Sequence, residues 1–403
     1  MASVDLESLA GDLTSAVRAY KAAPPSSTDA VLNRRLVTQL AKSIITEIEE
    51  PGERPFDYVA QTAELATLRM LMEWRAIEHI PPTGSITYTE LASKISADPS
   101  LIRRFCWPSV ASGLLAQPTT DAVAHTAASR CFLNENPQGA YFKCLYDFVT
   151  PASVAWPRWA ATHGRTAPVE PSDNPFSHGH GAPDKGYWEI LTGQFLLDLN
   201  AAMQNLDAIL PTNGAYPFGL IAEGAAKVAP DAALVVDVGA GRGQAIERMR
   251  EECPAIPPER CVLQDTEEVI ADVERMGAEG LRGVKRMVVD YFEEQPCKGA
   301  LVYFMRRIMH DWSDKYCVQI LERLRDAMAE HSRILIMDQI LENPPSRVTA
   351  AMDIVMMTVG AGERDVKSWN ELIEKVGGLE VVKFWRNPVS PMGVVEVKKK
   401  ASS

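Results

Sequence analysis

The sequence lacks the features that mark secreted and membrane-spanning proteins. Its seven cysteines are scattered, with no CxxC pair and an odd total, which favours free thiols in a reducing compartment over a disulfide framework. The opening residues, MASVDLESLAGDL, show no basic segment followed by an apolar run, and no apolar stretch reaches the ~18 residues of a membrane span. We therefore expect a cytoplasmic protein with no membrane partner.

Positive charge is also scarce. The chain has 41 Lys and Arg against 53 Asp and Glu, a formal net charge of -12. Such an acidic chain repels polyphosphate and anionic lipid, so we expect no nucleic-acid partner. The 403 residues, 46% of them hydrophobic, are enough for two or three domains with large cores.

Residues 1–130 have the pattern of a helical, winged-helix domain. A helix is predicted over Thr87–Ile95, a second is capped by Asp98 with Pro99 in its first position, and LLAQPTTDAVAHT suits a two-stranded wing. The recognition helix of a DNA-binding protein would need cations here, and this one offers only Arg103 and Arg104. A protein–protein or dimerisation module is therefore favoured over a DNA-binding one.

Residues 131–185 are rich in Pro, Trp and Gly and predict connecting helices and a surface loop. The string SHGHG places His178 and His180 one residue apart. Two histidines without a nearby Cys or a second ligand pair are weak evidence for a metal site. A solvated loop is the preferred interpretation, and we expect no metal.

From residue 230 onward, apolar strands alternate with amphipathic helices. Strands are expected at 233–238, 260–265 and 333–341, and within VKRMVVD and ALVYFM. This alternation predicts an α/β fold with a doubly wound, largely parallel sheet. The closing segments LEVVKFW and VVEVKK are separated only by RNPVSPMG. They should pair antiparallel, because a parallel pair needs a longer crossover.

The string VVDVGAGRGQ places Gly239, Gly241 and Gly243 between a buried strand and a helix. Glycines there let the backbone turn tightly and approach a ligand closely. The spacing is GxGxG, not the GxGxxG of dinucleotide-binding folds. Asp237 precedes the turn, where a carboxylate would oppose a pyrophosphate but suits the cationic end of a zwitterionic ligand.

Three further strand ends carry complementary groups. Asp265 ends the second strand and can accept the hydroxyl protons of a ribose, although it could also cap the next helix. Asp290 and Tyr291 follow the third strand, where they could hold an adenine, and Arg306 ends the fourth, where it could pair with a carboxylate. Together these strand ends predict a nucleoside-like ligand with an amino-acid portion.

Five strings carry a resemblance to a known family, in the same order along the chain: LVVDVGAGRG, DYFEEQP, YFMRRIMHDWSD, ILIMDQIL and MDIVMMTVGAGERDVKSWNELIEKVGG. They resemble the S-adenosylmethionine-dependent O-methyltransferases of the caffeic acid type, which are cation-independent, and especially the fungal enzymes of aromatic natural-product pathways. The resemblance implies a Rossmann-like methyltransferase domain over 131–403, a dimerisation domain over 1–130, and a homodimer.

The resemblance also implies S-adenosylmethionine as cofactor, S-adenosylhomocysteine as product, and a donor site. The residues that match it are Asp237, Gly239, Ala240, Gly241, Asp265, Asp290, Tyr291 and Arg306, the last in place of a lysine in the plant enzymes. A small phenolic acceptor of polyketide origin is expected. The candidate acceptor-binding residues are Trp188, Met203, Asp311 and Met356.

His310, in FMRRIMHDWSD, matches the general base of the family. A histidine of ordinary pKa, near 6.5, is mostly neutral at pH 7 and can take a phenolic proton. Glu363 and Asp338 match two carboxylates that steady this histidine, but Asp338 is one methylene shorter than the glutamate of the plant enzymes. The sequence therefore leaves open which of them orients His310.

Two alternatives stand beside this interpretation. A NAD(P)-dependent oxidoreductase would share the glycine turn but leaves the final hairpin and the His310–Glu363 combination unexplained. A non-catalytic winged-helix regulator with a degenerate methyltransferase fold would not need the donor-site residues. His310 could also be a polar residue that merely opens a helix.

Overall fold

The computed structural model describes residues 5–134, 136–193, 199 and 210–401. These residues form two compact units, one ending at Asp147 and the other running from Phe148 to Gly193 and onward from residue 210. Helix α6 (Pro137–His163) passes from the first unit into the second. No helix in the described part is both long and apolar enough to cross a membrane, and all seven cysteines are free thiols.

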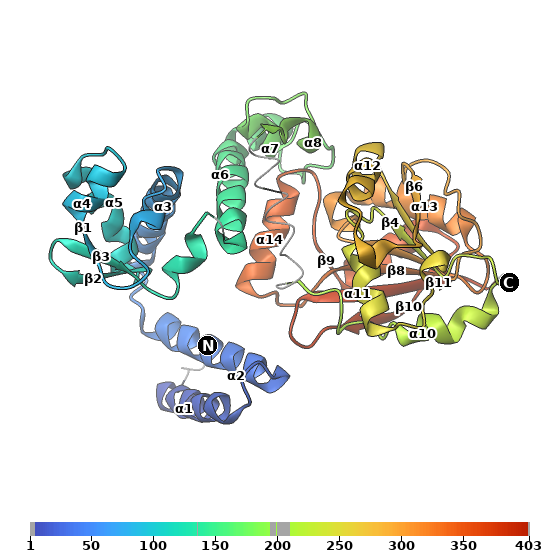
Figure 1. Cartoon of the computed structure of the whole chain (residues 1–403), viewed down its shortest axis with the longest axis horizontal. Coiled ribbons are helices and arrows are strands. Elements are labelled where there is room, and N and C mark those ends of the chain that lie inside the picture. The colour runs from blue at the N-terminus through green and yellow to red at the C-terminus, as the bar shows by residue number, and fades with distance from the viewer. Residues whose placement is uncertain (1–4, 135, 194–198, 200–209, 402–403) are drawn as a thin grey trace. The chain divides into compact units, whose positions relative to one another are not determined.

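The first unit contains the helices and the small sheet predicted for it (Figure 1). Its elements are α1 (Leu6–Ala22), α2 (Thr28–Ile48), α3 (Arg54–Glu73), β1 (Ile86–Thr87), α4 (Tyr88–Lys94), α5 (Pro99–Ala111), β2 (Leu115–Thr119) and β3 (Ala122–His125). The helix–turn–helix and its wing are present, and β1 extends the wing to a three-stranded sheet of order β1-β3-β2. Asp98 caps α5 by accepting a hydrogen bond from the Leu101 amide.

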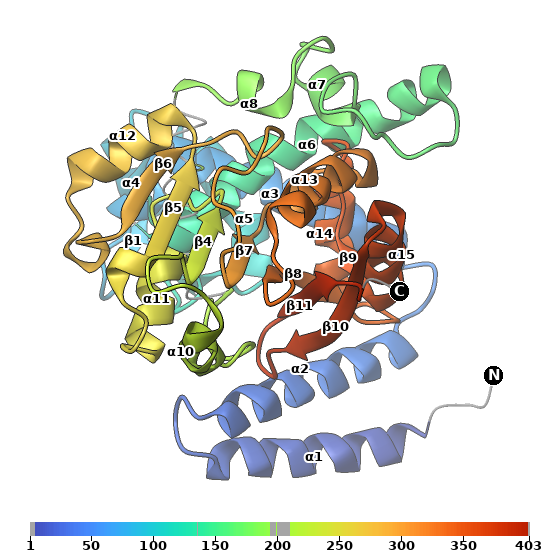
Figure 2. The ribbon, with the colours of Figure 1, turned by 90° about the vertical axis from the view of Figure 1, so that its right-hand side faces the viewer.

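The second unit is built on one mixed sheet. Its strands are β4 (Val235–Val238), β5 (Cys261–Asp265), β6 (Lys285–Val288), β7 (Val302–Arg306), β8 (Arg333–Leu341), β9 (Arg364–Asp365), β10 (Leu379–Arg386) and β11 (Met392–Lys399). The order is β10-β11-β8-β7-β4-β5-β6, with β9 paired to β8 (Figure 2). The core is parallel, and β11 is antiparallel to both β8 and β10. The predicted doubly wound sheet with a closing antiparallel hairpin is confirmed.

Helices cover both faces of this sheet. The helices that contribute to the core on one face are α10 (Gly219–Glu223), α11 (Gln244–Glu252) and α12 (Glu267–Met276), and those on the other face are α13 (Asp314–Ala327) and α15 (Val366–Val376). The unit also contains α7 (Pro175–Gly179), α8 (Tyr187–Ile190) and α14 (Arg347–Met357). Successive residues of β7 belong to hydrophobic cores on opposite faces of the sheet. Phe304 packs with α11 and α12, whereas Tyr303 and Met305 pack with α13 and α15. This period of two, with both sets apolar, is what a sheet buried on both faces requires.

The parallel strands place their carboxyl ends at one edge of the sheet. Val238, Asp265 and Arg306 end β4, β5 and β7, and Arg306 lies opposite Met337 of β8. Ligands bind at this edge in open α/β sheets. The fold therefore brings together strand ends that are far apart in the sequence.

The region around SHGHG differs from the solvated loop that was expected. His178 belongs to the short helix α7, which Asn174 caps by accepting a hydrogen bond from the Ser177 amide. Phe176 of this helix is fully buried. The segment is therefore anchored, and its histidines lie in a defined environment.

Candidate active site

The glycine turn follows β4, and at two of its positions there is no room for a side chain. Gly239 has φ 70° and Gly243 has φ 83°, in the left-handed region that side chains disfavour. A Cβ at Gly239 would stand 2.5 Å from Cδ1 of Ile308, and one at Gly243 would stand 2.7 Å from Cδ1 of Leu281. The turn therefore needs glycine for both conformation and space, as a backbone that cradles a ligand does.

Asp237 lies at the end of β4, directly before this turn, and is 1% exposed. Burial raises the pKa of its carboxyl to about 7, with the charge of Asp265 adding to the rise and that of Arg306 opposing it. Among the described residues, its Oδ2 has no hydrogen-bond partner. A buried carboxylate oxygen without a partner is costly, and a donor from a bound ligand would satisfy it.

Asp265 holds the turn and still has free accepting capacity. Its Oδ2 accepts from the Gly241 amide at 2.8 Å, and its Oδ1 accepts from the Thr266 amide at 2.8 Å. Burial raises the pKa of this carboxyl, and the two amide hydrogen bonds counteract the rise. The N-cap of α12 is Thr266, not Asp265, so the helix-capping alternative does not hold. Each carboxylate oxygen can accept further protons from a ligand.

The remaining donor-site candidates lie around the same edge. Asp290 is exposed, and its Oδ1 accepts from the Phe292 amide at 2.9 Å. Tyr291 reaches the turn, with its Cε1 3.8 Å from the place of a Cβ on Gly239. Arg306 donates through Nη2 to the Leu210 carbonyl at 2.7 Å. Its charge also acts on the Asp237 carboxyl.

His310 lies in the turn Met309–Asp311, just beyond the end of β7, and its side chain is 6% exposed. Its Nδ1 stands 3.0 Å from Oε1 of Glu363. Gln339 donates to the same oxygen through Nε2 at 2.7 Å. The Gly362 amide donates to the His310 carbonyl at 3.2 Å, so backbone and side chain are both tied to the segment that carries Glu363.

The structure shows which of the two carboxylates, Glu363 or Asp338, contacts His310. Glu363 contacts Nδ1 of His310, whereas neither carboxylate oxygen of Asp338 has a hydrogen-bond partner among the described residues. Asp338 is buried, at 1% exposure. On the other side of the ring, Nε2 of His310 is 3.4 Å from Oδ1 of Asp311. Glu363 is therefore placed to orient the imidazole, and Nε2 is the nitrogen left for another partner.

These carboxylates change the protonation of His310 from the one expected. Burial alone would lower the pKa of His310, but the charges of Asp311, Glu363 and Asp338 outweigh it and raise the pKa to about 9. Burial raises the pKa of Asp338 to about 7. Burial would also raise the pKa of Glu363, but the charge and hydrogen bond of His310 lower it. The carboxylates around His310 thus favour its protonated form, and its pKa lies above the ordinary value expected from the sequence.

Two residues that the sequence did not single out hold this arrangement. Arg364, 6% exposed, donates to the carbonyls of Met309 and Trp312, each at 2.9 Å, on either side of the histidine. Asp353 accepts from the Glu363 amide at 2.9 Å. The signal for Arg364 was its position next to Glu363 in GERD. Nothing local marks Asp353, ten residues upstream.

The acceptor-binding candidates are less closely grouped. Met356 is half-buried on α14, and Asp311 lies beside His310. Trp188 is 57% exposed, with its ring 4.6 Å from that of Tyr187. Met203 falls outside the described residues. Their contact with an acceptor stays a prediction.

The raised pKa of His310 predicts how stability depends on pH. A histidine whose pKa rises on folding stabilises the native state fully below its unfolded pKa, near 6.5, and this stabilisation is lost as pH rises to about 9. His310→Gln should flatten this fall in unfolding free energy. Denaturant titrations between these pH values measure the unfolding free energy of the wild type and of His310→Gln. Equal pH dependence in the two would contradict the charged His310–Glu363 pair.

Comparison with known proteins agrees with this geometry. Residues 226–378 match the model of an O-methyltransferase domain. The methyltransferase cfoD of Aspergillus candidus is 35% identical over 98% of this chain and 99% of its own. The O-methyltransferase afvC of Aspergillus flavus is 31% identical over 86% of this chain and 84% of its own. The fold is shared with OxaC in complex with SAH and oxaline, at a TM-score of 0.85 and 23% identity, over 98% of this chain and 99% of that one.

The residues at the sheet edge fit S-adenosylmethionine. The glycine turn can approach a ligand closely, and the buried Asp237 offers an unpartnered acceptor next to it. The many carboxylates of this edge suit a donor with positive charges and disfavour a pyrophosphate. The chain belongs to the O-methyltransferase family and is an S-adenosylmethionine-dependent O-methyltransferase.

Proposed function

We propose that this enzyme methylates a hydroxyl group of a small phenolic natural product of polyketide origin, with His310 as general base. The observation that carries the proposal is the buried contact of 3.0 Å between Nδ1 of His310 and Oε1 of Glu363. With Nδ1 occupied, Nε2 is the ring nitrogen left to receive a proton. Family membership favours methyl transfer over the oxidoreductase and regulator alternatives.

When bound, S-adenosylmethionine supplies a methyl group on a positively charged sulfur. As the acceptor oxygen takes up this methyl group, Nε2 of His310 would receive the hydroxyl proton. Glu363 then stabilises the imidazolium through Nδ1. The hydrogen bonds from Gln339 to Glu363 and from Arg364 to the backbone on both sides of His310 keep this pair in place.

A general base must be neutral, and the carboxylates around His310 favour its protonated form. Its pKa falls when positive charge is bound nearby, because like charges disfavour each other. The carboxylates of Asp237 and Asp265 would draw a cationic donor to this edge. Donor binding would then bring His310 nearer to neutrality, which favours the base form of His310 when the donor is in place.

At the donor site, we assign the ribose to Asp265 and the methionine portion to Asp237, Gly239, Ala240 and Gly241. Asp290 and Tyr291 are assigned to the adenine. Support comes from the free accepting capacity of Asp265 and from the tight turn that it holds. Arg306, whose charge acts on Asp237, is assigned to the carboxylate of the methionine portion.

Replacement of His310 tests the general-base assignment. His310→Gln should lower turnover by about 10²–10⁴-fold, the usual contribution of a positioned base, while S-adenosylhomocysteine binding is retained. Single-turnover assays with labelled donor and a panel of phenols measure the first effect, and calorimetry measures the second. His79→Gln is the matched control, since His79 is exposed in the first unit. Unchanged turnover in His310→Gln would refute the assignment.

Asp265 tests the donor site. Asp265→Asn should weaken S-adenosylhomocysteine binding by at least about tenfold, because an amide accepts through one atom only and its NH₂ group faces the Gly241 or Thr266 amide. The control is Glu267→Gln, which removes a carboxylate from an exposed position two residues further along. Titration calorimetry compares the two variants. Equal affinities would place the ribose elsewhere.

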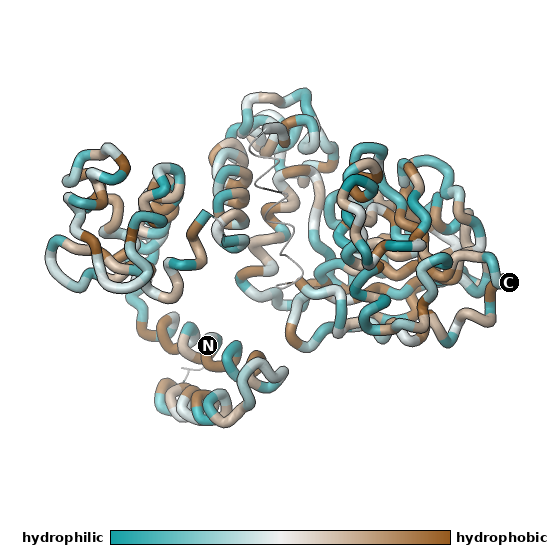
Figure 3. The backbone as a smooth tube through the Cα atoms, viewed as in Figure 1, coloured by the Kyte–Doolittle hydropathy of each residue, from teal (hydrophilic) through white to brown (hydrophobic). Residues whose placement is uncertain are grey.

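Dimerisation through the first unit is a further part of the proposal. Hydrophobic residues are interspersed with polar ones along α1 and α2 (Figure 3), and Ile45 and Ile48 of α2 are 59% and 62% exposed. At the start of α3, Phe56 and Val59 are 76% and 69% exposed. Large apolar side chains exposed at the end of α2 and the start of α3 are typical of an interface.

We therefore expect a dimer in solution that the double variant Phe56→Glu/Val59→Glu dissociates, because charges buried without partners are costly. Light scattering after size-exclusion chromatography gives the mass. Val382→Glu, at a residue of the second unit that is 44% exposed, should remain dimeric. A monomeric wild-type protein would contradict the expectation.

A further inference from the structure

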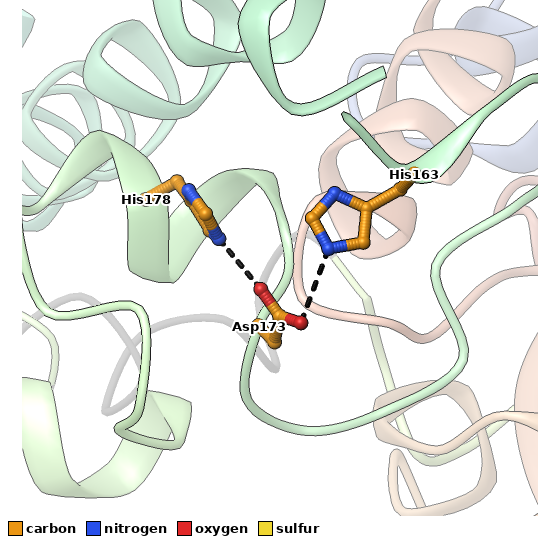
Figure 4. A group of neighbouring side chains, drawn as sticks. All are labelled: His163, Asp173 and His178. Atoms are coloured by element: carbon orange, nitrogen blue, oxygen red, sulfur yellow. Dashed lines mark hydrogen bonds and ion pairs between the residues drawn. The ribbon is translucent and has the colours of Figure 1, made fainter. Parts of the chain in front are cut away.

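A group of three metal-ligating side chains lies outside the candidate active site. His163 ends α6, His178 is in α7, and Asp173 lies between them (Figure 4). Oδ2 of Asp173 is 3.1 Å from Nε2 of His163, and its Oδ1 is 2.6 Å from Nε2 of His178. The three residues each offer one ligand atom, and these atoms lie within 4.8 Å of one another.

Both ring nitrogens of His163 face acceptor oxygens, which favours a positive charge at this ring. Its Nδ1 is 2.9 Å from the Trp159 carbonyl, which can only accept, and its Nε2 faces the Asp173 carboxylate, which also only accepts when ionised. A neutral imidazole has one N–H and cannot satisfy both. The Thr162 hydroxyl, 2.8 Å from Nδ1, donates its own proton to the Trp159 carbonyl at 2.9 Å, so it leaves Nδ1 as the donor. With Nδ1 protonated, a second proton or a metal ion satisfies the Nε2 side. A ring N–H donated to a backbone carbonyl, with the other nitrogen turned to the site, is the usual support of a metal-bound histidine.

Trp159 orients two members of the group at once. Its ring stacks on the His163 imidazole, with centroids 4.5 Å apart and planes 4° from parallel. Its Nε1 donates to the Asp173 carbonyl at 2.8 Å, and the Asp173 amide donates to the Pro183 carbonyl at 2.7 Å. Asp173 holds φ 53°, a left-handed conformation that these contacts maintain. The ligand atoms are therefore preorganised by their neighbours.

We propose that His163, Asp173 and His178 bind a divalent transition-metal ion of the Zn²⁺ type, with water in the remaining coordination positions. Two imidazoles and a carboxylate are a donor set that such ions prefer. Around a tetrahedral ion with bonds of about 2.0–2.2 Å, ligand atoms stand about 3.3–3.6 Å apart. The oxygens of Asp173 stand 3.1 Å from Nε2 of His163 and 2.6 Å from Nε2 of His178, so both separations would have to widen on binding. The side chains are 30%, 58% and 32% exposed in chain order, so an ion can enter from solvent.

Such an ion would stabilise the segment 163–178, which contacts elements close to the candidate active site. Within this segment, Glu170 binds Lys315 at 2.7 Å and the Tyr316 hydroxyl at 2.6 Å, both on α13. The Phe176 amide donates to the Thr358 carbonyl at 3.0 Å. Thr358 lies five residues before Glu363. The role of the metal is therefore structural, and it does not depend on the identity of the general base.

The experiment uses the full chain, stripped with a chelator and titrated with Zn²⁺ or Co²⁺ above pH 7, where free imidazole is neutral. Calorimetry gives stoichiometry and affinity, thermal unfolding gives the change in Tm, and Co²⁺ absorption reports on coordination by nitrogen. The variants are His163→Gln, His178→Gln and Asp173→Asn. His180→Gln, which changes the other histidine of SHGHG, is the control. Circular dichroism confirms that each variant is folded.

The proposal predicts one ion per wild-type chain, a Tm that rises with Zn²⁺, and retention of both in His180→Gln. Each of the other three variants should bind at least about tenfold more weakly and lose the Tm response, since metal affinity depends on every ligand. Absence of binding to the wild type, or undiminished binding in Asp173→Asn, would overturn it. Variants that lower Tm equally with and without Zn²⁺ would also overturn the proposal. The three side chains would then stabilise the protein only through hydrogen bonds between protonated histidines and Asp173.

Discussion

The structure depends on an imidazole and a carboxylate that are buried together. His310 and Glu363 are almost completely removed from water, and the desolvation of such a pair is repaid only when the geometry is good and further hydrogen bonds satisfy both groups. Gln339 supplies such a bond to Oε1 of Glu363, whereas Oε2 has no partner among the described residues. Asp353 accepts from the Glu363 amide, and Arg364 donates to the backbone around His310, so both groups are held in place. Removal of one partner would leave an uncompensated buried charge, which typically costs about 3–5 kcal/mol.

Negative charge is concentrated at the same edge of the sheet. This charge connects the proposed binding of a cationic donor with the pKa of His310. Burial raises the pKa values of Asp237 and Asp338 to about 7, and the acidic neighbours of His310 raise its pKa to about 9. A ligand that brings positive charge relieves this excess of carboxylates. It also lowers the pKa of His310. In the proposed function, the features that would select a cationic methyl donor would also prepare His310 as the base.

Local sequence was enough for the strands, the helices and the glycine turn, because these follow from periodicity and from the conformational demands on Gly239. It was not enough where distant segments meet. The insertion of β11 between β8 and β10, and the choice of Glu363 over Asp338, are set by tertiary pairing and by the reach of individual side chains. The metal-ligating group shows the same limit, since His163 lies 15 residues before His178 and SHGHG shows only one of its members.

The central claim is that Nε2 of His310 receives the proton of the acceptor hydroxyl beside the bound donor. A crystal structure of the enzyme with S-adenosylhomocysteine and a phenolic acceptor tests it most directly. The account predicts a phenolic oxygen within hydrogen-bonding distance of Nε2, on the side from which the sulfur is reached. An acceptor hydroxyl held by other groups, with His310 remote from both ligands, would contradict it.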